Sequence, residues 1–214
     1  MAGGSTTPAR RADLGLGGAA RIALGGLAER TGADASLKDV VGPGGVTPLA
    51  YARAGVAPHW DVGLSAASTT LRGELRGELL LDAKSSLRPA LLVAAAVFGG
   101  PVHDDGAFRG GRVGAGLPLL LVLDASSLVE LWVGPRVRIE RVWAEIGPGD
   151  APVDGAATGI GLGGVIGVAV GFRHLHALAE LSAAWERWSG TFDGDAALAS
   201  GVVLTPAFGL RLRL

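Results

Sequence analysis

The sequence predicts an all-β fold, an antiparallel up-and-down transmembrane β-barrel of about ten strands. Three observations predict it. Several segments alternate apolar and polar residues with a period of two, which is the period of a β-strand. The composition is 49% hydrophobic and only 18% charged, and the chain contains 36 Gly among 214 residues. A sheet that faces lipid on one side and a polar lumen on the other accounts for both the apolar composition and the alternation.

The clearest alternation covers the C-terminal segment 201–214. Apolar side chains such as Phe208 occupy one face there, and the other face carries Arg211 and Arg213. Segments 71–81 and 129–140 repeat the pattern, with Arg and Glu on one face and Leu, Val or Ile on the other. In a helix these charges would point in every direction. The three runs therefore predict strands.

The segment 156–172 offers an alternative, because it approaches the roughly 20 apolar residues of a transmembrane helix. Its Gly163, Gly167 and Gly171 also have the spacing of a helix-dimerising face. Gly fills so many further positions that an isolated helix would be weak. We therefore predict a strand for this segment as well.

The same period places ten strands, an even number as in single-chain bacterial barrels. They cover residues 13–26, 47–57, 60–67, 69–81, 87–98, 111–124, 128–143, 158–173, 176–188 and 201–214. Short turns connect them at one end. Longer loops rich in Gly, Asp and Pro connect them at the other end, at residues 27–46, 99–110, 144–157 and 189–200. This asymmetry predicts short periplasmic turns, with both termini on their side, and longer extracellular loops.

The predicted barrel domain covers residues 13–214, after a segment 1–12 that is expected to be disordered. The chain does not begin with the apolar core of a signal peptide. If the protein is exported, we expect that peptide to have been removed or the start to be misassigned.

The polar face of the predicted strands is rich in small residues, Arg and Glu, and no Lys lies within those strands. A crowded lumen fits this composition better than a solvated sheet surface, which favours Lys and Thr. Unpaired buried charges are costly, so these side chains are expected to pair, with Arg21 on the same face. The predicted lumen charge network consists of Arg53, Asp61, Arg72, Glu74, Arg76, Glu78, Arg112, Glu130, Arg136, Arg138, Glu140, Arg173, Glu180, Glu186, Arg211 and Arg213.

Aromatic side chains lie near the ends of several predicted strands. Aromatic girdles mark the two membrane interfaces of transmembrane barrels. We therefore expect a membrane girdle that consists of Trp60, Trp143, Phe172 and Trp185, with Trp188 beside it.

Residues 53–64, which contain the turn before Trp60 and Asp61, are followed by the alternating run 71–79. This sequence resembles the hairpins of small Gram-negative outer-membrane β-barrel proteins, and 116–121 leading to 129–136 is similar in style. The resemblance covers the chain from about residue 47 onward. It implies a location in the bacterial outer membrane, with membrane lipid and lipopolysaccharide as neighbours.

The resemblance also implies a C-terminal assembly signal, matched by Gly209, Leu212 and Leu214. Recognition by the barrel-assembly machinery is therefore expected. The chain departs from the family's pattern at two positions, since Leu214 replaces a terminal aromatic residue and Ala207 replaces a polar one.

No catalytic, cofactor or metal site is predicted. The chain has no Cys, no nucleophile elbow and no P-loop, and His59, His174 and His176 are interpreted as turn residues. A net charge of -1, with all but two of the 19 basic residues being Arg, argues against a nucleic-acid partner.

These observations predict an integral outer-membrane barrel that is a structural envelope component or a narrow, porin-like pore. A small solute or ion could pass through its charge-paired lumen, and the excess of Arg favours an anion. One alternative is an outer-membrane rim hydrolase, similar to a protease, that uses His103, Asp104 and Asp105. Another is a soluble β-barrel that binds an apolar ligand.

Overall fold

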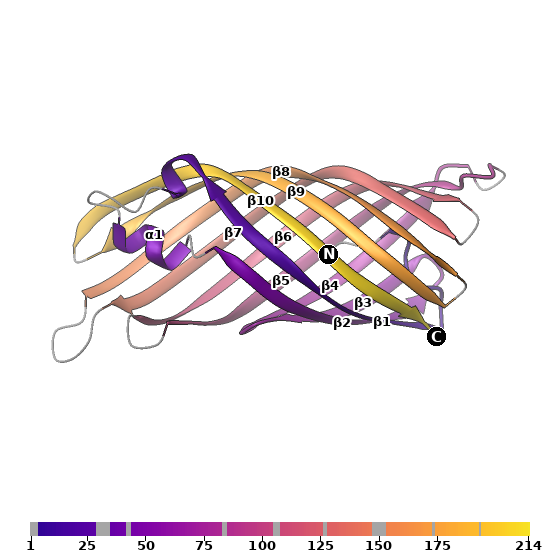
Figure 1. Cartoon of the computed structure of the whole chain (residues 1–214), viewed down its shortest axis with the longest axis horizontal. Coiled ribbons are helices and arrows are strands. Elements are labelled where there is room, and N and C mark those ends of the chain that lie inside the picture. The colour runs from indigo at the N-terminus through magenta and orange to yellow at the C-terminus, as the bar shows by residue number, and fades with distance from the viewer. Residues whose placement is uncertain are drawn as a thin grey trace.

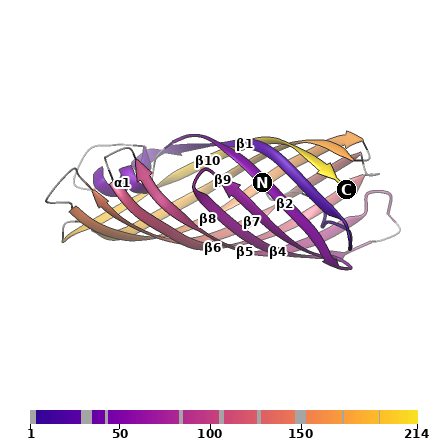
Figure 2. The same ribbon diagram turned by 90° about the horizontal axis from the view of Figure 1, so that it is seen from below.

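The computed structural model describes residues 4–28, 35–41, 44–82, 85–104, 108–125, 128–146, 153–172, 174–192 and 194–214. Ten antiparallel strands close into one barrel, in which β1 lies between β10 and β2 (Figure 1, Figure 2). The strands are β1 (Ala12–Leu24), β2 (Gly45–Ala57), β3 (Trp60–Ala67), β4 (Thr70–Leu80), β5 (Pro89–Asp104), β6 (Phe108–Ala125), β7 (Val129–Ile146), β8 (Val153–Phe172), β9 (Leu175–Phe192) and β10 (Asp195–Arg213). The predicted fold class and the predicted number of strands are confirmed.

The two ends of the barrel differ. We call the end at which β2 meets β3 and β10 finishes the turn end, and the opposite end the loop end. The connection between β1 and β2 contains a 3-10 helix, η1 (Gly25–Leu27), and a helix, α1 (Ala35–Val41), at the loop end (Figure 1). No helix among the described residues is long and apolar enough to span a membrane.

The strands at the loop end are longer than predicted. β5 and β6 pair until Asp104 meets Phe108, so most of the predicted loop 99–110 is strand. The predicted loops 144–157 and 189–200 are likewise mostly taken up by β7, β8, β9 and β10. Their Gly, Pro and Asp residues suggested loops, but each strand end has a neighbour that satisfies its backbone hydrogen bonds.

The outer face of the barrel is apolar and the inner face is mixed. Alternate residues of each strand, such as Leu131, Val133 and Ile139 of β7, are exposed on the outside. Their neighbours Glu130, Trp132 and Glu140 are buried on the inside. This is the arrangement that the period of two predicts for a barrel in lipid.

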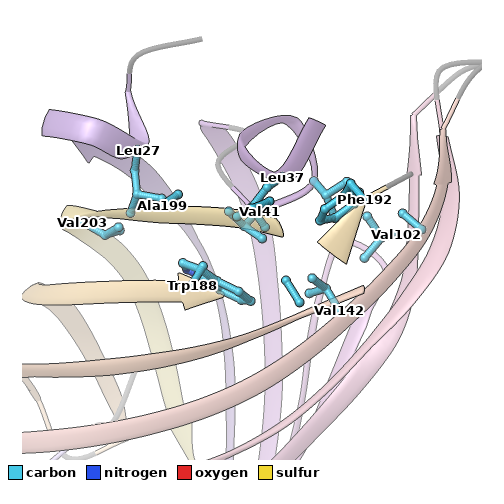
Figure 3. Close-up of a cluster of buried hydrophobic side chains, with 13 residues drawn as sticks. Leu27, Leu37, Val41, Val102, Val142, Trp188, Phe192, Ala199 and Val203 are labelled. Carbon is cyan, nitrogen blue, oxygen red and sulfur yellow. The ribbon is translucent and has the colours of Figure 1, made fainter. Parts of the chain in front are cut away.

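A cluster of buried apolar side chains lies at the loop end of the lumen (Figure 3). Leu37 and Val41 of α1 are buried against Trp188 and Phe192 of β9, and Leu27 of η1 joins the same cluster. The helix is short, so its stability comes from this packing. We call this group of side chains the apolar lid.

Residues 4–11, which belong to the segment expected to be disordered, make hydrogen bonds to the barrel wall. The backbone N–H of Thr7 donates to Asp61 Oδ2 at 2.7 Å, and the backbone N–H of Thr6 donates to Glu78 Oε2 at 2.8 Å. Ala12 already belongs to β1. These contacts place the segment in the turn end of the lumen.

Candidate lumen site

Fully buried ion pairs form a layer near the turn end. Arg76 of β4 binds both carboxylate oxygens of Asp61 on β3, at 2.8 Å and 2.5 Å. Arg211 of β10 donates twice to Glu130 Oε2 at 3.0 Å, and Arg213 binds the other oxygen of Glu130. The Arg76–Asp61 pair is bidentate, and this geometry is what makes Arg suitable for buried pairs.

The N-terminal segment completes this layer. The Ser5 hydroxyl donates to Glu130 Oε1 at 2.9 Å, and the Thr6 hydroxyl donates to Glu78 Oε2 at 2.6 Å. Residues that are distant in the chain therefore bind these carboxylates at the turn end of the lumen.

A second layer of charge lies nearer the loop end. Arg21 of β1 pairs with Glu186 of β9 through two bonds of 2.8 Å and 3.1 Å. Arg138 hydrogen-bonds Glu140, and Arg112 lies 3.5 Å from the same carboxylate. Arg21 also donates to the carbonyl of Val41 at the end of α1, so this layer is linked to the apolar lid.

Two Trp side chains hydrogen-bond carboxylates of the lumen. Trp188 Nε1 donates to Glu186 at 3.1 Å, and Trp132 Nε1 donates to Glu180 at 3.2 Å. Both indole rings are buried. Trp188 therefore lies in the lumen, and its expected place beside the membrane girdle is wrong.

In this second layer the Arg side chains are more accessible than their acidic partners. Arg138 has a side-chain exposure of 29% and Glu140 of 2%, while Arg21 has 23% and Glu186 has 7%. Arg72 of β4 is 36% exposed, and its partner Glu74 is 7% exposed. We call the part of the lumen that contains the second layer, Arg72 and Arg136 the middle lumen. In these described pairs the accessible charged group is the guanidinium, and the carboxylate is buried.

Arg136 of β7 differs from the other Arg residues of the middle lumen. It is partly buried, and neither a hydrogen bond nor an ion pair joins it to another described residue. It lies within electrostatic range of Glu180, Arg138 and Arg72.

The barrel wall is low beside this region. On the loop-end side, β3 ends at Ala67 and β4 begins at Thr70. Nearer the loop end than this hairpin, residues 45–48 of β2 pair only with β1, and residues 100–104 of β5 pair only with β6. Thr69 Oγ1 donates to the carbonyl of Pro101 at 2.9 Å, so the tip of the hairpin is tied to β5. We call this part of the barrel the low wall.

The predicted charge network is distributed over the two layers. The layer near the turn end contains Asp61, Arg76, Glu78, Glu130, Arg211 and Arg213, and the second layer contains Arg112, Arg138, Glu140 and Glu186. Arg53 and Arg72 both pair with Glu74, and Glu180 accepts a hydrogen bond from Trp132. Arg173 lies outside the described residues. The prediction did not include Asp13, whose carboxylate is buried 3.8 Å from Arg213, although its position in the alternation indicates the inner face.

The predicted girdle residues lie on the outer face. Trp60 and Phe172 stand at the turn end of β3 and β8, and Trp143 lies near the loop end of β7. Trp185 is exposed on the outer face of β9. Gly209, Leu212 and Leu214 are in or beside the end of β10, and both Leu side chains point outward.

Two residues of the hydrolase alternative lie in a strand and not in a long loop. His103 and Asp104 are the last residues of β5, and Asp105 lies outside the described residues. His176 is buried on the inner face of β9 and is not a turn residue. His174 lies in the turn between β8 and β9, as predicted, and contacts the carbonyl oxygen of Arg213. Among the described residues, no group of three His, Asp or Glu side chains could hold a metal ion.

No protein-family model matches the sequence. No curated protein matches it by sequence either.

Solved structures do match the fold. The outer membrane protease OmpT from Escherichia coli aligns with a TM-score of 0.50 and 8% identity, over 95% of this chain and 96% of that one. Neisserial surface protein A aligns with a TM-score of 0.39 and 14% identity, over 94% and 95% of the two chains. A major outer membrane protein from Thermus thermophilus aligns with a TM-score of 0.41 and 13% identity, over 95% and 99%. The chain has the fold of outer-membrane β-barrel proteins, and the likeness extends to the fold alone.

Proposed function

We propose that this chain is an integral outer-membrane β-barrel that serves as a structural component of the envelope, with a lumen that is closed at both ends. One observation carries this proposal. The buried side chains of the apolar lid lie at the loop end, and residues 5–7 hydrogen-bond the carboxylates of the turn end. A barrel of about ten strands has a narrow interior even before such closure.

The outer face supports membrane residence. A transmembrane strand needs about 9–11 residues, and on β9 the apolar outward positions run from Leu175 to Trp185. Arg187 follows on the same face, as does Arg141 after Ile139 on β7. These two exposed guanidinium groups would contact the phosphate groups of membrane lipid or lipopolysaccharide.

The proposal is tested by folding and conductance. We expect the purified chain to fold only in detergent or lipid, with a heat-dependent shift on gels. We also expect planar bilayers that contain it to show no stable conductance steps. Folding as a monomer in plain buffer would contradict membrane residence, and large steady steps would contradict the closed lumen.

A narrow pore for small anions is a second candidate. The observation that favours it is the accessible guanidinium surface of the middle lumen. In this case the N-terminal segment acts as a plug that has to leave. The bilayer measurement separates the two candidates, because rare steps with an anion-selective reversal potential in a salt gradient would favour the pore.

A rim hydrolase is the third and weakest candidate. We propose that the chain is not an enzyme, since the function proposed above needs no catalytic group. Replacement of His103 by Ala tests this proposal, because it would abolish any peptidase or lipid-hydrolase activity that depends on the rim.

A further inference from the structure

The middle lumen contains a group of Arg residues that exceeds the acids around it. We call this group the arginine cluster; it consists of Arg21, Arg72, Arg112, Arg136 and Arg138. Its members are coupled to one another, because Arg112 and Arg138 share Glu140 and Arg136 lies within electrostatic range of Arg72 and Arg138. Arg112 also lies within range of Arg21.

The acidic side chains that the structure describes near the cluster do not balance it. They are Glu140, Glu180 and Glu186, together with Glu74, whose charge is also used by the buried Arg53 at 3.2 Å. Arg136 is left with no ion pair to any described residue. A partly buried guanidinium without a partner is costly, and a bound anion would remove that cost.

The geometry also separates the donors from the acids. Glu74 and Glu140 are buried, whereas Arg72 and Arg138 keep a large accessible surface. Arg138 lies over the Phe98 ring, with its Cζ atom 4.8 Å from the ring centroid, and this contact favours its place in the lumen. A ligand that enters the middle lumen therefore meets N–H donors before it meets a carboxylate.

We propose that the arginine cluster binds an oxyanion, a phosphate or sulfate group, with Arg136 as the central donor and Arg72 and Arg138 beside it. Planar guanidinium groups bind such groups through two parallel N–H bonds, which a chloride ion cannot accept. The low wall lies next to Arg72, so the ligand can be a free oxyanion or the phosphate group of a lipid in the outer leaflet. The site does not depend on whether the lumen conducts.

The test uses the full chain, folded in a non-ionic detergent at constant chloride concentration. Inorganic phosphate is titrated by calorimetry, and a second titration uses micelles doped with dioctanoyl phosphatidate. The variants are Arg136→Gln and, as a matched control, Arg88→Gln, which removes an exposed Arg from the turn between β4 and β5. Circular dichroism and the heat-dependent gel shift establish that each variant is folded.

We expect saturable binding to the wild type and to R88Q, and binding at least about tenfold weaker in R136Q, because charge-assisted bonds to the anion are lost. Binding of phosphate identifies a free oxyanion as the ligand, and binding of phosphatidate alone identifies a lipid. Absence of saturable binding to both probes, or equal affinities of R136Q and R88Q, overturns the proposal. If R136Q does not fold, Arg72→Gln is the second variant, with the same expected loss.

Discussion

At the scale of single residues, the pair Arg76 and Asp61 shows how the lumen depends on exact charge matching. Both side chains are almost fully buried, and Asp61 also accepts a bond from Thr7. A buried pair contributes little more than apolar residues of the same size would, but removal of one partner leaves an uncompensated charge.

Arg76→Leu is therefore expected to lower the free energy of unfolding by about 3–5 kcal/mol. The double variant R76L/D61L should recover most of this loss, because it leaves no single charge buried. Denaturant unfolding in detergent measures both. Equal stability of R76L and the wild type would show that water reaches Asp61.

Single Gly residues on β8 make room for the aromatic rings of the lumen. Trp132 pairs with Gly167 across β7 and β8, and Trp188 pairs with Gly159 across β8 and β9. A Cβ atom at Gly167 would lie 2.2 Å from Trp132 Cε2. The many Gly residues of β8 thus let each ring lie flat on the neighbouring strand.

Gly167→Ala is expected to cost about 1–3 kcal/mol of stability, because the added methyl group has to push Trp132 away from Glu180. Gly73→Ala is the matched control, since the nearest atom to a Cβ there is Val97 Cγ2 at 4.0 Å. Thermal unfolding and tryptophan fluorescence measure the difference. The same loss in both variants would mean that backbone freedom, and not the ring, requires glycine.

At the scale of elements, the N-terminal segment is the part of the lumen that is held by the weakest contacts. Its described contacts with the wall are hydrogen bonds of polar groups to carboxylates and to backbone, such as Arg10 N–H to Gly55 O at 3.0 Å. Contacts of this kind contribute little net free energy when water can replace them.

Deletion of residues 2–11 should keep the barrel folded and open the turn end to water. The chain has no Cys, so a single Thr205→Cys on the inner face of β10 reports access. We expect a charged thiol reagent to label it faster in the deletion variant. The control is R10Q/R11Q, which keeps the backbone contact of Arg10; equal labelling in all variants would show that the segment does not close the mouth.

At the scale of the whole molecule, the sequence predicts the barrel well because the period of two is preserved along every strand. It also predicts which face a residue occupies. Trp188 and His176 are instructive, because the alternation with Glu186 places both inside, and only their nearness to predicted strand ends suggested otherwise. The alternation was the better guide for both residues.

The remaining features of the candidate site depend on contacts between residues distant in the chain. Ser5 meets Glu130, and Arg21 meets Glu186, across separations of 125 and 165 residues. No local pattern encodes such contacts. Arg72 is exposed because β3 and β4 are short. The positions at which these two strands end are set by their pairing with the longer strands β2 and β5.

The low wall has a consequence for the bilayer around the protein. β3 has 8 residues and β8 has 20. With the usual strand tilt, 8 residues rise only about 20 Å, which is less than the roughly 25 Å apolar band of outer-membrane barrels. Lipids beside β3 must shorten to match this height, at a cost that is shared with a tilt of the whole barrel. The protein would thus thin the membrane on one flank, the flank at which Arg72 comes nearest to the outer leaflet.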